Sequence, residues 1–363
     1  MFEAVSPEGY EILRKLEGEA TRLGFKILEA YFSYGIPYLI VDPPENQKEA
    51  FKKLIEALRP YNIMPILRRG PKGLVLRAFF FEPRKAKSNL IPLALFLATF
   101  ATIFATGWLL SDAYGLPQGP VVGAFMFVGA MMAVLATHEL GHWIAARIHG
   151  VSVTPPHFIP APPFITIFGT FGAFIQQRTP APNKDALFDI GVAGPVAGFV
   201  ASLAITLIGL PLSRIEVGPA EGIRLPYILA YAMMIRLTLS PPREAFIILH
   251  PVAFAGWVGM LVTMLNLIPA GSLDGGHIAR CVFKAKDHMV LGVITSLFIA
   301  ILSFLFYGGW YLPMAMLALL MAMLYRHPGP LDDVSELAPW RKAALLVPVL
   351  IFLLCILPIE LPP

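Results

Sequence analysis

The sequence predicts a multi-spanning α-helical membrane protein with a small N-terminal soluble α+β domain. Of its 363 residues, 56% are hydrophobic and only 14% are charged, a composition typical of membrane proteins. The charged residues are unevenly placed, because residues 1–88 hold 15 of the 28 Lys and Arg and 11 of the 24 Asp and Glu. We therefore expect a soluble domain over residues 1–88 and a transmembrane domain over residues 89–363.

The N-terminal segment reads as two successive helix-strand-strand units. Ser6 and Pro7 form a typical helix start, with an N-cap side chain followed by proline in the first turn. Apolar residues at helical spacing then predict a helix to about residue 23, and a second helix is expected over 45–58. Each helix precedes a predicted hairpin, with strands at 25–32 and 37–41 and at 62–68 and 74–81.

Seven apolar segments of the remaining chain are predicted to span the membrane. They cover approximately 90–110, 120–148, 186–211, 247–269, 289–307, 310–325 and 343–359. A further apolar stretch at 226–239 is short and interrupted by Arg236, so we expect it to be interfacial, and an eighth span is the alternative.

The basic residues next to these segments predict an orientation. Arg84, Lys85 and Lys87 lie just before the first span and place the N-terminal domain in the cytoplasm by the positive-inside rule. Arg147 then returns the chain to the cytoplasmic side after the second span. The net charge of +4 does not indicate a nucleic-acid partner, because no basic patch is interleaved with stacking aromatic residues. The expected surroundings are the lipid bilayer.

A metal-site motif lies inside the second predicted span. His138 and His142 are four residues apart, so both imidazoles project from one helical face and can bind one metal ion, with Glu139 beside them as a base. Ionisable groups at membrane depth are costly and usually functional. The alternative is a buried hydrogen-bonded His-Glu-His cluster without metal. The position of this motif corresponds to the cytoplasmic half of the bilayer.

A catalytic zinc site needs a third protein ligand, and Asp274 is the first candidate. It follows a Pro- and Gly-rich interruption at 266–276, and such irregular backbone is tolerated at membrane depth where it lines a protected cavity. His277 is a rival ligand. Asp274 could instead cap the next helix.

These motifs together resemble the site-2 protease family of intramembrane zinc metalloproteases, in its archaeal and plant-chloroplast-like branch. The resemblance rests on His138 to His142 and on Asn266-x-x-Pro269-x-x-x-x-Asp274-Gly275. It extends to the glycine-containing segments 169–173 and 193–198 and covers about 115–290. The chain departs from the common Asn-Pro-Asp-Gly form of the third-ligand motif, although it keeps the aspartate and the glycine.

The resemblance implies roles for individual residues. His138, His142 and Asp274 would bind one Zn²⁺, Glu139 would be the catalytic base, and Asn266 would lie beside the substrate. The segment 152–178 would form a membrane-dipping hairpin.

Gly169 and Gly172 lie in that segment, in an apolar run of residues that favour β-structure. An exposed strand edge there could pair with an unwound substrate, which makes both glycines candidate substrate-binding residues. Packing against the wall of the helical domain is the simpler alternative, and Asn266 could likewise be a helix-packing amide.

The implied function is endopeptidase cleavage in or near transmembrane segments of membrane proteins, as in regulated intramembrane proteolysis. Two other classes stay open. A metal-ion transporter also places His and Asp within the membrane, and an inactive binding protein could retain the same motifs. The glutamate between the histidines and the single three-ligand set favour the hydrolase.

Overall fold

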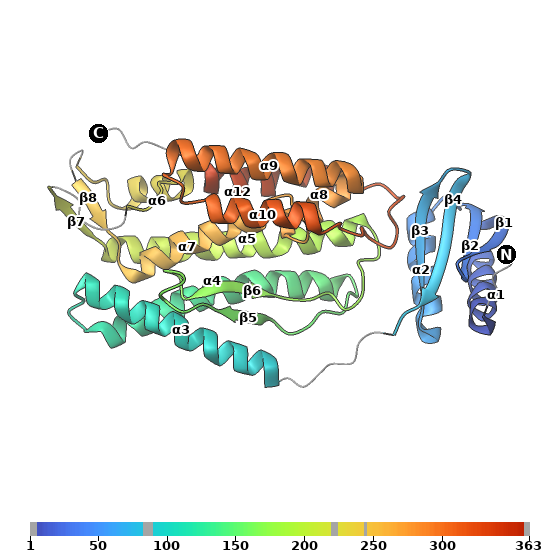
Figure 1. The fold of residues 1–363 in the computed structure, drawn as a ribbon, viewed down its shortest axis with the longest axis horizontal. Coiled ribbons are helices and arrows are strands. Elements are labelled where there is room, and N and C mark those ends of the chain that lie inside the picture. Colours follow the sequence, from blue (N-terminus) through green and yellow to red (C-terminus); the bar gives the residue numbers. More distant parts are fainter. Residues whose placement is uncertain (1–5, 83–89, 219–223, 243–244, 359–363) are drawn as a thin grey trace.

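The computed structural model describes residues 6–82, 90–218, 224–242 and 245–358. A bundle of helices forms most of the molecule, and a smaller part made of one sheet and two helices lies beyond one end of the bundle (Figure 1). The predicted fold class is therefore confirmed.

The N-terminal part contains both predicted helix-strand-strand units. Its elements are α1 (Pro7–Arg22), β1 (Lys26–Ser33), β2 (Ile36–Asp42), α2 (Gln47–Leu58), β3 (Ile63–Gly70) and β4 (Gly73–Phe80). The strands form an antiparallel sheet in the order β1-β2-β4-β3, so β3 lies at an edge. The Ser6 side chain accepts a hydrogen bond from the Gly9 N–H and caps α1, as the sequence predicted.

This part has a hydrophobic core of its own. The apolar faces of α1 and α2 pack on the sheet, where Leu16, Leu54 and Leu76 are completely buried. One member of the core is not from the N-terminal segment: Leu331, from the far end of the chain, is 4% exposed and packs in the same cluster. A distant loop is thus built into this small domain.

Five of the described helices are long and apolar enough to cross a membrane, and the chain is an integral membrane protein. These spans are α3 (Leu90–Tyr114), α4 (Pro120–Ile148), α5 (Lys184–Gly209, extended by a 3-10 turn to Leu212), α9 (Ala285–Phe306) and the pair α11 (Pro339–Ala344) and α12 (Leu346–Ile356).

Three described apolar helices are shorter, namely α6 (Leu229–Thr238), α7 (Pro251–Asn266) and α10 (Leu312–Leu324). Two of them, α7 and α10, occupy the predicted spans at 247–269 and 310–325. At about 1.5 Å per residue, the 16 residues of α7 extend only about 24 Å, less than the hydrocarbon thickness of about 30 Å. Helix α7 ends at Asn266, inside the helical domain, and α8 (Asp274–Val282) follows.

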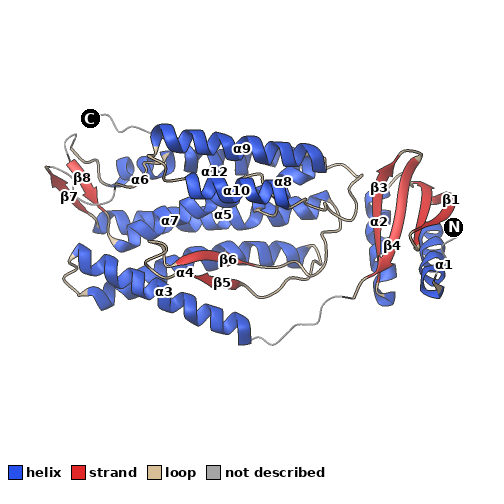
Figure 2. Cartoon of the chain, viewed as in Figure 1, coloured by secondary structure: helices blue, strands red, loops and turns tan. Residues whose placement is uncertain are grey.

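Two short hairpins complete the fold (Figure 2). Strands β5 (His157–Pro160) and β6 (Thr170–Phe174) pair antiparallel and lie beside α3 and α4, within the segment where the sequence predicted a hairpin. Strands β7 (Arg214–Val217) and β8 (Ala245–Ile248) pair at the opposite end of the bundle from the N-terminal domain (Figure 1).

Small residues let the central helices approach closely. A Cβ atom at Gly141 of α4 would lie 2.5 Å from the Ala193 carbonyl oxygen of α5. On its other side α5 meets α7, where Gly259 leaves room for the buried hydroxyl of Ser202. Helix α5 is therefore held tightly between α4 and α7, which positions the polar residues of all three helices.

Candidate metal centre

Helix α4 presents His138 and His142 on its buried face. Their side chains are 6% and 7% exposed, and their ring centroids are 4.9 Å apart. The Nε2 atoms of the two rings are 3.1 Å apart. The spacing of four residues thus produces the convergence expected from one helical turn.

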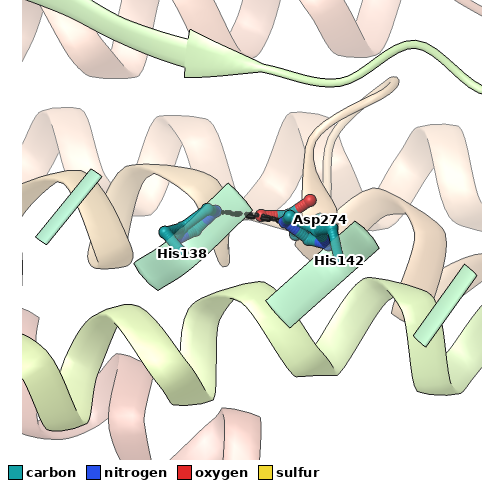
Figure 3. A group of neighbouring side chains, drawn as sticks. All are labelled: His138, His142 and Asp274. Carbon is teal, nitrogen blue, oxygen red and sulfur yellow. Dashed lines mark hydrogen bonds and ion pairs between the residues drawn. The ribbon is translucent and has the colours of Figure 1, made fainter. Parts of the chain in front are cut away.

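The third predicted ligand reaches this pair from another helix. Asp274 is the first residue of α8, and its Oδ2 lies 3.2 Å from Nε2 of His138 and 3.2 Å from Nε2 of His142 (Figure 3). Among the residues that the structure describes, these three form the one group of His, Cys, Asp and Glu side chains close enough to hold a metal ion. A tetrahedral zinc site with bonds of about 2.0–2.1 Å separates its donor atoms by about 3.3 Å, so the three atoms suit that ion.

A backbone contact orients His142 for metal binding. Its Nδ1 lies 2.7 Å from the Ile190 carbonyl oxygen of α5, so Nδ1 carries the proton and donates it to that oxygen. Nε2 is then left with a lone pair directed at His138 and Asp274. Such a second contact is the usual way in which proteins fix a metal-binding imidazole.

Glu139 is buried beside the group and only partly satisfied. Its side chain is 3% exposed, and Oε2 has no hydrogen-bond partner. The backbone of Ile175, just after β6, hydrogen-bonds to the carboxylate. A buried carboxylate oxygen without a partner is costly unless it has a further role, such as accepting a proton or binding water.

A cavity of about 890 Å³ opens onto the three predicted ligands. Its wall contains His138, Glu139 and Asp274, together with Ile175 to Arg178, which follow β6. Phe81 of the N-terminal domain also lines it, as do Tyr325, His327, Pro328 and Gly329. Burial lowers the pKa of His327 in that wall to about 2, so its imidazole is neutral and accepts the Gly329 N–H at Nδ1. The cavity gives water a route between the group and the end of the bundle that faces the N-terminal domain.

The other predicted site residues lie at different distances from the group. Asn266 borders the cavity, with Nδ2 3.3 Å from Nε2 of His138. His277 also borders it, but its Nδ1 bonds to the Leu273 carbonyl oxygen and the residue is not part of the three-ligand group.

Gly169 and Gly172 do not border the cavity. A Cβ atom at Gly169 would lie 2.7 Å from Cα of Ile103, so this glycine packs against α3. Gly172 has a φ of +100° within β6, and a Cβ atom added there would have no atom within 4 Å. Their assignment to substrate binding stays a prediction.

The spacing of Gly191, Gly194 and Gly198 along α5 is typical of close helix packing, and the structure gives two of them a direct relation to the metal group. A Cβ atom at Gly194 would overlap with Nε2 of His142, and one at Gly198 would lie 2.8 Å from Nδ1 of His138. The four-residue spacing of Gly194 and Gly198 along α5 matches the four-residue spacing of His138 and His142 on α4, and this correspondence could have indicated their role.

Replacing Asp274 by Ala is expected to lower zinc affinity by at least about 100-fold, because one of three protein donors is lost. Zinc affinity would be measured by competition with a chelator on purified protein. Asp287→Ala, an exposed carboxylate in the first turn of α9, is the matched control and should bind zinc as the wild type does. Unchanged affinity in Asp274→Ala together with loss in His277→Ala would make His277 the third ligand.

The family model described as Peptidase family M50 matches residues 126–307, which include both metal-ligand motifs. The chain belongs to peptidase family M50. This match confirms the resemblance to site-2 proteases, and the two motifs that carried the resemblance lie on α4 and at the start of α8.

Curated relatives of this M50 chain include plant proteins named as probable zinc metalloproteases. The chain is 33% identical over 237 residues to the probable zinc metalloprotease EGY1, chloroplastic, of Oryza sativa subsp. japonica, covering 63% of this chain and 40% of that protein. It is 30% identical over 236 residues to the EGY1 protein of Arabidopsis thaliana, covering 63% and 42%. The chain thus spans about two fifths of the length of these relatives. No solved structure matches it.

Proposed function

We propose that this protein is a zinc endopeptidase that hydrolyses peptide bonds in or near transmembrane segments of membrane proteins. The observation that carries the proposal is the convergence of three donor atoms, 3.1–3.2 Å apart, next to a buried carboxylate oxygen of Glu139 that has no partner. Membership of peptidase family M50 and the names of the plant relatives support the same activity.

His138, His142 and Asp274 would hold the zinc ion. When bound, the ion would lower the pKa of a water molecule bound to it and polarise the carbonyl of a peptide bond. Glu139 would take a proton from the attacking water and return it to the nitrogen of the broken peptide bond. The Asn266 amide, at the edge of the group, would orient the substrate backbone.

The β5–β6 hairpin and the residues that follow it indicate how a substrate could approach the metal group. The chain from Ala173 to Arg178 borders the cavity, and the Ile175 backbone already contacts Glu139. A substrate segment that leaves its helix can hydrogen-bond to this strand as an added strand, which would carry its backbone past the ligands. Unwinding is required because the carbonyl oxygens of a helix are already bonded.

Zinc content and cleavage, measured on the same purified sample, test the proposal. The full chain in detergent should contain about one zinc ion and cleave a single-span substrate, with both properties lost on chelation and recovered with added Zn²⁺. Cleavage that survives complete zinc removal would contradict the proposal. Zinc-dependent ion flux in vesicles without cleavage would instead indicate the transporter class.

The distribution of basic residues supports a cytoplasmic N-terminal domain. Basic residues gather at the end of the bundle next to that domain: Arg147, Arg178, Lys184, Arg280, Lys284, Lys286, Arg326, Arg341 and Lys342. The opposite end, with the β7–β8 hairpin, carries Arg214, Arg224 and Arg236 among the described residues, against nine at the first end. By the positive-inside rule the metal group then opens to the cytoplasm.

A cysteine at exposed Lys52 is expected to react with an impermeant maleimide only from the cytoplasmic face of sealed membranes. Both native cysteines are buried, so the introduced thiol is the reporter. Glu216→Cys in β7 is the matched control and should react only from the other face. Reaction of Lys52→Cys from the outer face would reverse the proposed orientation.

A further inference from the structure

The N-terminal domain is held to the membrane domain by strand pairing. The segment 331–333, between α10 and α11, runs parallel to the β3 edge, where Leu67 N–H donates to the Leu331 carbonyl at 3.0 Å and Asp333 N–H donates to the Leu67 carbonyl at 3.3 Å. On its other side the same segment pairs with the residues before α5, with Leu331 N–H donating to the Ala181 carbonyl at 2.9 Å. This short segment, residues 331–333, thus joins the edge of the N-terminal sheet to the helical bundle, and we call it the docked segment.

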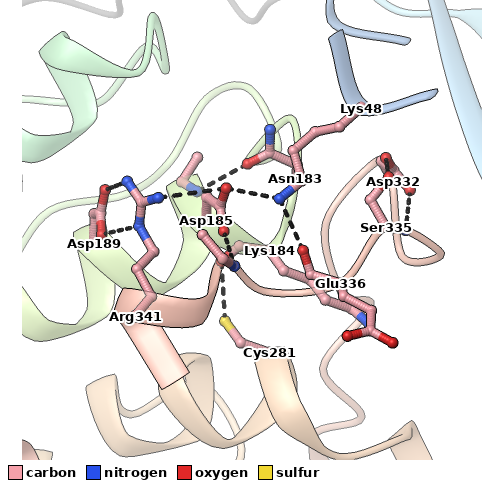
Figure 4. Close-up of polar contacts among 12 residues, drawn as sticks. Lys48, Asn183, Lys184, Asp185, Asp189, Cys281, Asp332, Ser335, Glu336 and Arg341 are labelled. Atoms are coloured by element: carbon pink, nitrogen blue, oxygen red, sulfur yellow. Dashed lines mark hydrogen bonds and ion pairs between the residues drawn. The ribbon is translucent and has the colours of Figure 1, made fainter. Parts of the chain in front are cut away.

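Side chains make this docking specific, and Figure 4 shows two of them, Lys48 of α2 and Asp185 of α5. Leu331 is buried in the core of the N-terminal domain, and the guanidinium of Arg68 donates to the Leu331 carbonyl oxygen at 2.7 Å. Lys48 of α2 donates to Asp185, in the first turn of α5, at 2.8 Å. An apolar anchor, a cation on a carbonyl and an ion pair therefore act around the paired backbone.

The docked segment is also tied to the helix that carries the third metal ligand. Arg280 of α8 is 5% exposed, and its guanidinium donates to both carboxylate oxygens of Asp333, at 3.1 and 2.5 Å. It also donates to the Phe283 carbonyl oxygen at 3.1 Å. Gly329 lies directly against it, since a Cβ atom there would be 2.7 Å from Nη2. Because paired, planar contacts restrict both partners, Arg280 fixes the last turn of α8 to the docked segment.

Helix α8 connects Arg280 to the metal group. Asp274 is its first residue, and Arg280 lies six positions further along the helix, about 9 Å away. We propose that Arg280 is a positioning residue, through which docking of the N-terminal domain holds the Asp274 carboxylate in place for metal binding. The inference rests on the proposed metal site. Since coupling between two equilibria is reciprocal, bound zinc must then stabilise the docked domain.

Zinc affinity of the full chain in detergent tests the role of Arg280. Arg280→Gln and Asp333→Asn should each weaken zinc binding by about tenfold, the lower end of the effect of residues that orient metal ligands. The absorption spectrum of bound Co²⁺ should change as well, because it reports the ligand geometry. Lys284→Gln removes the same charge from an exposed position four residues later and should leave both readouts unchanged. The double variant Arg280→Asp with Asp333→Arg restores an ion pair of reversed polarity, so it should bind zinc more tightly than Arg280→Gln or Asp333→Asn.

Docking of the N-terminal domain is tested with variants outside α8. Leu331→Ser removes the apolar anchor in the N-terminal domain and should weaken zinc binding although it touches no ligand. The labelling rate of Gln47→Cys reports undocking, because Gln47 of α2 donates to Ser335 beyond the docked segment. Labelling should be faster in Leu331→Ser and faster in the otherwise unchanged protein after zinc removal.

The outcomes separate the two proposals. If the wild type and Lys284→Gln bind zinc, and Arg280→Gln, Asp333→Asn and Leu331→Ser bind it equally well, the positioning role is overturned and the proposed function stands. Labelling of Gln47→Cys that does not respond to zinc also overturns the coupling. A wild type that binds no zinc overturns the proposed function, and this inference with it.

Discussion

Replacing Glu139 by Gln is expected to abolish cleavage and to leave zinc bound. The substitution removes the base but keeps the shape of the side chain and all three ligands, so the rate should fall by about 10²–10⁴-fold, the usual contribution of a general base. Cleavage of a single-span substrate and zinc content would be measured on the same preparation.

Asp112→Asn provides the matched control for this experiment. It makes the same carboxylate-to-amide change at an exposed position near the end of α3, far from the metal group. It should cleave and bind zinc as the wild type does. Near-native cleavage by Glu139→Gln would remove the assigned role of Glu139, and loss of its zinc would make Glu139 a part of the metal site rather than a base.

Replacing Gly194 by Ala is expected to prevent zinc binding, although the new side chain is a single methyl group. That methyl would occupy the space of Nε2 of His142, and the imidazole would have to turn away from His138 and Asp274. Alanine is a better helix former than glycine, so α5 should remain helical. We expect zinc affinity to fall by at least about 100-fold, as for the loss of a ligand.

Gly129→Ala is the control, because this glycine lies in α4 and has no atom within 4 Å of an added Cβ. Zinc content by elemental analysis and helix content by circular dichroism would be compared in the two variants. Full zinc occupancy in a correctly folded Gly194→Ala protein would show that the α4–α5 contact is looser than the structure indicates.

The sequence was sufficient for much of the fold because the signals involved are local. Apolar run length predicted the long helices α3, α4, α5 and α9, and helix and turn residues predicted each element of the N-terminal domain. The same signals described α7 and α10 less well. Their predicted segments are apolar over more than 15 residues, but the helices are shorter. Helix α7 begins only at Pro251, after strand β8, and ends at the break that follows Asn266, and α10 begins after the turn that precedes Leu312.

For the metal group too, local sequence signals predicted some residues and not others. His138 and His142 could be paired from their spacing alone, since one helix holds both. Asp274 is 136 residues from His138, so no local spacing pairs the two. The Pro- and Gly-rich break before Asp274 made it the first candidate, and the resemblance to a known family implied the same role. The space that the imidazoles occupy could not be anticipated from α4 at all, because Gly194 and Gly198 of α5 create it.

Hydropathy, charge and helical spacing determined that this chain is a membrane protein with an N-terminal α+β domain and a candidate metal-binding helix, because those properties act between residues close in sequence. Docking is different. The pairing of Leu67 with segment 331–333, and the contact of Arg280 with Asp333, join parts of the chain that carry no shared local pattern. Their association depends on the shapes and unpaired hydrogen-bonding groups that the folded domains present to each other, and these exist only once both domains have formed.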